Sequence, residues 1–99
     1  MISLQLSEKQ RAIVQEILNQ YSIEFYVFGS RIKGTAKRLS DLDLCYKIPV
    51  KLSEITQIRE AFEESDLPFE VDIIDWNNCA PEFQAHIADD LVLLGPLLG

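Results

Sequence analysis

Gly29-Ser30-Arg31-Ile32-Lys33-Gly34-Thr35-Ala36-Lys37-Arg38-Leu39-Ser40-Asp41-Leu42-Asp43 is the stretch of this 99-residue chain from which most of the fold and the chemistry can be read. It follows Phe25-Tyr26-Val27-Phe28, an aromatic and β-branched run that predicts a buried strand ending at Gly29. Ser30 can begin a short helical turn, residues 37–40 read as a polar loop, and a second strand is predicted over residues 41–48, before Pro49. The stretch therefore predicts a strand, a tight turn and a second strand that begins with two aspartates.

The remaining segments supply helices and one further strand. Ser7 opens a capping-box pattern before a helix over residues 7–21, and Ser53 is predicted to cap a helix that ends before Leu67-Pro68. A third strand is expected over residues 69–75, and a last helix from Pro81. The chain is too short for more than one domain, so residues 1–99 are expected to form a single α/β domain.

Asp41 and Asp43 are candidate metal ligands. Successive side chains of a strand point to opposite faces, so these two carboxylates share one face while Leu42 and Leu44 enter the core. Aspartate is disfavoured in strands, so two of them between apolar residues need a reason. Mg²⁺ prefers carboxylates together with substrate phosphates, and the pair therefore predicts a magnesium site.

Asp72, between Val71 and Ile73, is the predicted third carboxylate. On a strand beside the second one it can point to the same face as the aspartate pair. There it could hold a second metal ion or take a proton from an attacking hydroxyl. Glu70 and Asp75 are its rivals: Glu70 shares its face nearer the strand start, and Asp75 falls on the opposite face.

The turn after the first strand is the candidate phosphate site. Gly29 allows the backbone to approach a phosphate, and Ser30 offers a hydroxyl and an N–H group. Arg31 and Lys33 could add charge-assisted contacts to a nucleotide. The spacing to Gly34 superficially resembles a P-loop, but no lysine follows that glycine, which excludes the P-loop interpretation.

Charge is unevenly distributed in this acidic chain, whose net charge is −7. Residues 1–51 hold eight Lys and Arg and five Asp and Glu, whereas residues 52–99 hold one Arg and eleven acids. The basic residues around the turn can attract a triphosphate locally, but a chain without a broad basic face is a poor candidate for binding duplex nucleic acid. Cys45 and Cys79 form no metal or disulfide pattern, and the sequence has no signal-like segment and no apolar run that could span a membrane, so we expect a cytoplasmic protein.

The C-terminal stretch Leu91–Leu98 carries no charge. Leu91 and Leu94 are expected to complete the core, whereas Leu97 and Leu98 follow a Gly95-Pro96 break and are expected to be exposed. The sequence thus suggests that the last two leucines dock a partner or a second copy of the chain.

Gly29-Ser30-x10-Asp41-x-Asp43, followed by Val71-Asp72-Ile73, resembles the nucleotidyltransferase superfamily of the DNA polymerase beta type, and in particular its minimal nucleotidyltransferases (MNT). The resemblance includes a specific motif, Ser40-Asp41-Leu42-Asp43-Leu44, and it runs over residues 10–94. The segment Leu67-Pro68-Phe69-Glu70-Val71-Asp72 also resembles small bacterial members encoded beside a HEPN-domain protein.

This resemblance implies a small mixed β-sheet flanked by helices, with Gly29 and Ser30 at the phosphates of a nucleoside triphosphate and Asp41, Asp43 and Asp72 binding Mg²⁺, as two ions. It further implies an antitoxin that transfers AMP from ATP to a hydroxyl of a HEPN-domain toxin, in a homo- or hetero-oligomer. Two alternatives remain open: an antitoxin that neutralises its partner by contact alone, and nucleotidyl transfer to a small molecule.

Overall fold

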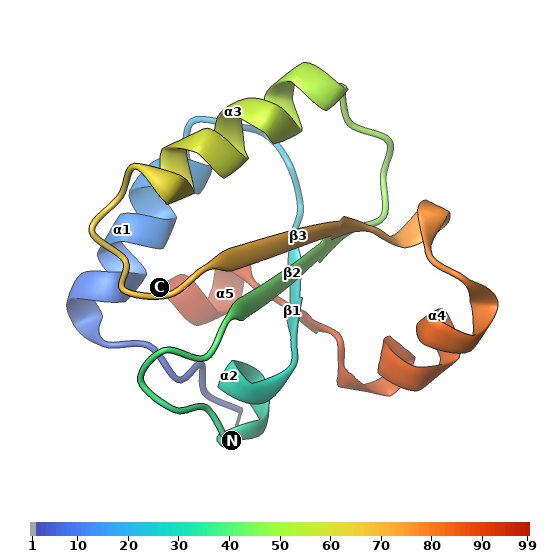
Figure 1. Cartoon of the computed structure of the whole chain (residues 1–99), viewed down its shortest axis with the longest axis horizontal. Helices are drawn as coiled ribbons and strands as arrows, with labels where there is room; N and C mark the ends of the chain where they lie inside the picture. Colours follow the sequence, from blue (N-terminus) through green and yellow to red (C-terminus); the bar gives the residue numbers. More distant parts are fainter. Residues whose placement is uncertain (1) are drawn as a thin grey trace.

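A four-stranded mixed sheet forms the centre of the molecule in the computed structural model, which describes residues 2–99 (Figure 1). The strand order is β3-β2-β1-β4; β1 is antiparallel to β2 and β4, and β2 is parallel to β3. Parallel strands need a long crossover connection, and α3 provides it between β2 and β3. The elements, in chain order, are α1 Glu8–Leu18, β1 Tyr26–Phe28, α2 Ser30–Lys33, β2 Leu42–Tyr46, α3 Leu52–Glu63, β3 Val71–Asp75, the 3₁₀ turn η1 Trp76–Asn78, α4 Pro81–Ile87, the 3₁₀ turn η2 Ala88–Asp90, β4 Val92–Leu93 and α5 Gly95–Leu98.

Helices α1 and α3 pack on one face of the sheet and enclose the main hydrophobic core (Figure 1). Val14 of α1 and Ile58 of α3 are fully buried there, against Val27, Leu42 and Leu44 of the strands. Burying such side chains contributes about 1.5–3 kcal/mol each before entropy costs. The predicted α/β class, with a mixed sheet flanked by helices, is confirmed.

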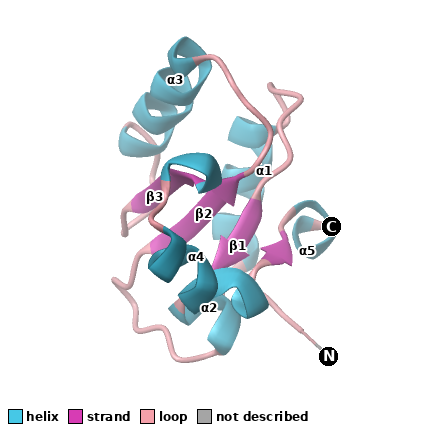
Figure 2. Ribbon diagram, turned by 90° about the vertical axis from the view of Figure 1, so that its right-hand side faces the viewer, coloured by secondary structure: helices cyan, strands magenta, loops and turns pink. Residues whose placement is uncertain are grey.

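The opposite face of the sheet is only partly covered. Helices α2 and α4 lie on this side (Figure 2), and Ile87 of α4 packs on Phe28 and Cys45 in a smaller apolar cluster. Phe83 of α4 is 40% exposed and meets Phe28 edge to face. This face is therefore left open enough to expose polar side chains of the strands.

Several element boundaries differ from the sequence-based predictions. Helix α1 ends at Leu18 instead of residue 21, and α3 begins at Leu52 after Lys51, so Ser53 lies inside the helix and does not cap it. A fourth strand, β4, was missed because two residues are too few to produce a hydrophobic period. No helix within residues 2–99 has both the length and the apolar character needed to cross a bilayer.

The expectation for the C-terminal stretch was wrong at its end. Leu94 is buried as expected, but Gly95 and Pro96 begin α5 instead of breaking the chain. Leu97 and Leu98 pack against the main core beside α1, and the backbone carbonyl of Gly99 accepts a hydrogen bond from Gln15 Nε2 at 3.0 Å. These two leucines are half-buried and contribute to the packing of the domain itself.

Candidate active site

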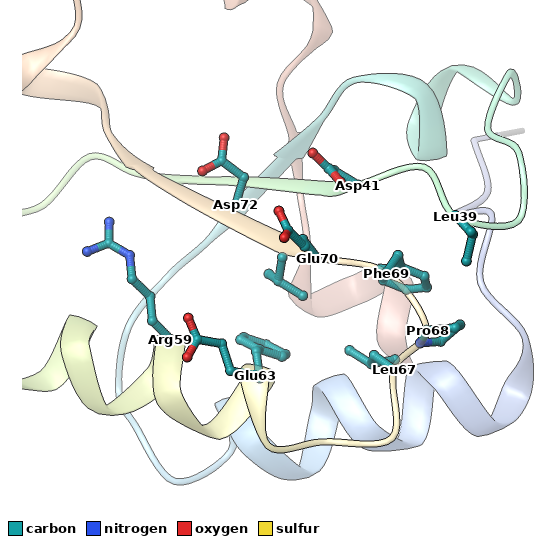
Figure 3. Close-up of a pocket in the computed structure, with 11 residues that line it drawn as sticks. Leu39, Asp41, Arg59, Glu63, Leu67, Pro68, Phe69, Glu70 and Asp72 are labelled. Carbon is teal, nitrogen blue, oxygen red and sulfur yellow. The ribbon is translucent and has the colours of Figure 1, made fainter.

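Strand pairing brings Asp43 and Asp72 side by side. The two residues are Cα partners in the parallel pairing of β2 with β3, so their side chains leave the sheet on the same face. Leu42 and Leu44, which flank Asp43, are fully buried on the other face. Asp41 lies just before β2 and is exposed, and Figure 3 shows its carboxylate and that of Asp72 rising from the same side of the strands.

The three carboxylates influence one another electrostatically. Burial, followed by the negative charges of Asp72 and Asp41, raises the pKa of the Asp43 carboxyl to about 6. Within residues 2–99, no Lys or Arg side chain forms a salt bridge with any of the three. Carboxylates that crowd together without a protein cation are a donor set suited to a divalent metal ion.

The carboxylates do not stand in a preassembled metal cage. The described part of the chain contains no group of three His, Cys, Asp or Glu side chains arranged closely enough to hold a metal ion. Asp41 and Asp72 are exposed and can change rotamer. The site therefore fits a cation that draws the side chains together when it arrives with its phosphate ligands.

Gly29 joins β1 to α2 in direct contact with this site. Its φ of 81° lies in the left-handed region that favours glycine. A Cβ placed on Gly29 would overlap the Oδ2 atom of Asp43. The turn backbone and the carboxylate are thus packed against each other, and Ser30, which is half-buried, begins α2 at the same place.

Arg31 does not occupy the place that the sequence suggested for it. Its side chain is 4% exposed, and its guanidinium nitrogens donate hydrogen bonds to the carbonyl oxygens of Gln5, Lys37, Arg38 and Ser40, at 2.8–3.3 Å. The guanidinium also stacks on Phe69, 3.8 Å from the ring centroid. Because all of these contacts turn the group inward, Arg31 is not free to bind phosphate.

The network of Arg31 ties three segments together. It joins the N-terminal segment at Gln5 to the loop that precedes Asp41, and it reaches Phe69 just before β3. Burial lowers the pKa of the Arg31 guanidinium, and the charge of Asp41 opposes that shift. The structure therefore supports a positioning role for Arg31, which holds the loop that leads into Asp41.

Lys33 remains available to a ligand. Its Nζ lies 3.2 Å from Asp90 Oδ2 in η2, with half of the lysine side chain exposed. Exposed pairs of this kind contribute about 0–1 kcal/mol, so a triphosphate could take Lys33 from Asp90 at little cost.

A groove opens beside the carboxylates, between α3 and β3 (Figure 3). It has a volume of about 660 Å³ and includes Asp41 and Asp72 at its border. Its floor is apolar, with Phe62, Leu67 and Phe69 among its lining, and Arg59 and Glu63 of α3 rise along one side. Sequence reasoning missed this groove, although Arg59 is the one Lys or Arg in residues 52–99 and could have been noticed for that reason.

Glu70 and Asp75, the alternatives to Asp72 as the third carboxylate, lie in other positions. The Asp75 carboxylate accepts a hydrogen bond from the backbone N–H of Asn77 at 3.0 Å and caps η1. Glu70 is exposed and lines the groove, one residue before β3. Register with Asp43 therefore favours Asp72 as the third carboxylate.

Comparison with known proteins gives a consistent result. Residues 12–95 match the family described as "Polymerase beta, Nucleotidyltransferase". A relative from Haemophilus influenzae, named "Probable protein adenylyltransferase MntA", is 39% identical over 95 residues, which is 92% of this chain and 83% of that protein. A chain from a crystal structure of a toxin-antitoxin with AMP-PNP has a TM-score of 0.63 at 19% identity, covering 85% of this chain and 71% of its own length. This structural likeness supports the fold alone.

Proposed function

Because the chain belongs to the polymerase beta nucleotidyltransferase family and is a nucleotidyltransferase, we propose that it transfers a nucleoside monophosphate, AMP from ATP, to a hydroxyl of a partner protein. The observation that carries this proposal is the contact of the Gly29 turn with Asp43, which is itself paired in register with Asp72. A glycine turn and a set of carboxylates at one point are what a triphosphate and its metal ions need.

Each group of site residues has its own role in the proposed transfer. Gly29 and Ser30 hold the phosphates by backbone and hydroxyl contacts, and Lys33 adds a positive charge. Asp41, Asp43 and Asp72 would hold Mg²⁺, as two ions, which would supply positive charge at the reacting phosphate and at the leaving pyrophosphate. Asp72, on the edge strand β3, would accept the proton of the incoming hydroxyl.

The reaction is a displacement at phosphorus. The acceptor oxygen forms a bond to the α-phosphorus, and the bond from that phosphorus to the oxygen bridging to the β-phosphate breaks. Pyrophosphate leaves with the electron pair, and the acceptor proton passes to the Asp72 carboxylate. Catalysis of this kind depends mainly on positioning and on charge stabilisation.

The partner is proposed to be the toxin of a toxin–antitoxin pair, with a HEPN domain, in a hetero-oligomer with this chain. The support is the similarity to a named protein adenylyltransferase, and the motifs shared with minimal nucleotidyltransferases. Cys45 and Cys79 are both free thiols, which fits a reducing compartment such as the cytoplasm.

Labelled ATP tests the proposed reaction. The chain and the protein that co-purifies with it are incubated with Mg²⁺ and ATP labelled at either the α- or the γ-phosphate. We expect the α-label, but not the γ-label, to become attached to the partner. Asp43→Asn should abolish the labelling, whereas Asp66→Asn, an exposed aspartate outside the site, should not.

An antitoxin that acts by contact alone is the second candidate, because the carboxylates do not form a preassembled metal cage. It predicts that the partner is neutralised equally well by the native chain and by Asp43→Asn. Labelling with γ-ATP, or no labelling together with full neutralisation, would rule out the proposed transfer.

A further inference from the structure

The free edge of the sheet lies beside the proposed active site. β3 is an edge strand, and Leu42 donates its N–H to the Glu70 carbonyl at 2.9 Å. Since backbone groups alternate in direction along a strand, Val71 and Ile73 turn their N–H and C=O groups away from β2. Arg59 Nη2 donates to the outward carbonyl of Ile73 at 2.8 Å, but residues 2–99 offer no backbone partner to the outward groups of Val71.

The groove runs along this edge. The 660 Å³ cavity beside Asp72 is followed by a second cavity of about 350 Å³, which includes Leu52 and Asp75, and Arg59 lines both. Together the two cavities follow β3 from Val71, which lines the first, to Asp75, which lines the second. Hollows that follow a strand in this way suit an extended polypeptide.

The border of the groove is acidic. Glu63 and Glu70 are exposed there together with Asp41 and Asp72, and Arg59 is the single basic side chain in the lining of the larger cavity. Even when bound cations neutralise the two aspartates, both glutamates remain to attract positive charge. The complementary segment is therefore basic.

We propose that the acceptor is an extended, basic segment of the partner protein that pairs with the free edge of β3, places its hydroxyl side chain over Asp72 and lays its neighbouring side chain in the groove. The positions of these side chains follow from the alternation of side chains between the two faces of a strand. In an antiparallel pair, a residue hydrogen-bonded to Val71 shares the groove side with the Val71 side chain. The next residue then lies opposite Asp72, on the carboxylate face, about 4.5–5.5 Å away between Cβ atoms.

Short synthetic peptides test the docking without nucleotide, so that the result does not depend on the proposed function on which this inference rests. The first peptide is basic, with a central serine, threonine or tyrosine. The second peptide has glutamate at every lysine position of the first. The third is the first peptide with alternate backbone amides methylated. Binding is followed by amide chemical shifts and by hydrogen exchange of the full chain.

We expect the basic peptide to perturb the amides of β3 and of the end of α3, and to protect the Val71 N–H from exchange. The methylated and acidic peptides should bind at least about tenfold more weakly, the first through lost strand pairing and the second through charge repulsion. Glu63→Lys should weaken the basic peptide by about threefold to tenfold, whereas Glu16→Lys, an exposed glutamate on α1, should leave its affinity unchanged.

Four results would overturn the proposal. Two concern the peptides: the methylated peptide binds as tightly as the basic peptide, or the basic peptide does not bind at millimolar concentration. The other two concern the chain: the amide shifts change away from β3 and α3, or protection of the Val71 N–H from exchange rises with the concentration of the chain alone. The last would show that a second copy occupies the edge. If docking holds but ATP labels neither peptide nor partner, the proposed transfer fails while this surface assignment stands.

Discussion

Replacing Arg31 distinguishes most sharply between a structural and a phosphate-binding role. The buried guanidinium serves four backbone carbonyls and the face of Phe69. Hydrogen bonds to a charged group contribute about 1.5–3 kcal/mol each, but they are not additive. Removing the guanidinium leaves its carbonyl partners without this donor, at about 1–3 kcal/mol for each one that water does not reach, so we expect Arg31→Ala to cost about 3–5 kcal/mol.

That loss is large for a domain of this size. A small domain has a total stability of about 5–15 kcal/mol, so Arg31→Ala should remove a large share of it. At about 4–8 °C per kcal/mol, the melting temperature should fall by roughly 12–40 °C. Arg31→Lys keeps the charge but loses the planar fork and the flat stack on Phe69, and we expect it to cost about 2 kcal/mol.

Urea denaturation followed by circular dichroism measures these differences. Arg38→Ala is the matched control, because Arg38 is exposed in the same loop and its side chain makes no hydrogen bond within residues 2–99; it should change stability by less than about 0.5 kcal/mol. A loss below about 1 kcal/mol for Arg31→Ala, with greatly weakened nucleotide binding, would refute the structural role and restore the role expected from the sequence.

Asp43→Asn should stabilise the nucleotide-free protein by about 1–2 kcal/mol near pH 8 and by almost nothing near pH 4. The raised pKa of the Asp43 carboxyl destabilises the fold only as pH rises from the ordinary pKa of an aspartate to about 6, and the half-exposure of the side chain reduces the effect. Denaturation at several pH values that gave the same pH profile for both proteins would contradict this. Gly29→Ala should lower the urea midpoint, because it combines a positive φ, which costs about 1–2 kcal/mol, with overlap on Asp43; an unchanged midpoint would be inconsistent with the contact. Truncation after Gly95 should cost about 2–3 kcal/mol in thermal unfolding, because Leu97 and Leu98 leave the core, and a normal melting temperature would show that they add nothing to it.

The sequence was sufficient where local pattern and tertiary structure agree. Apolar residues around Asp43 and Asp72 have the alternation of strands, and the pairing of β2 with β3 brings both carboxylates to one face as that alternation requires. β4 and α5 could not be predicted, because two or four residues carry no period and their place depends on Phe25, whose carbonyl accepts from Leu94 N–H.

Arg31 illustrates what residue type alone cannot decide. An arginine after a phosphate-type turn is as suitable for a ligand as for backbone carbonyls, and the choice is made by contacts from Gln5 and Phe69, which are distant in sequence. The groove was missed for the same reason: Arg59 and Glu63 acquire a meaning only when α3 is placed beside the edge of β3.

We propose that the Gly29-Ser30 turn and the three carboxylates form one nucleotide site. Paramagnetic broadening of backbone amides by Mn²⁺, added with the non-transferable analogue α,β-methylene-ATP, tests it directly. We expect selective broadening at Gly29, Ser30, Asp43 and Asp72, and its loss in Asp43→Asn. Broadening confined to the acidic end of α3, or the same pattern in the presence and absence of the analogue, would contradict it.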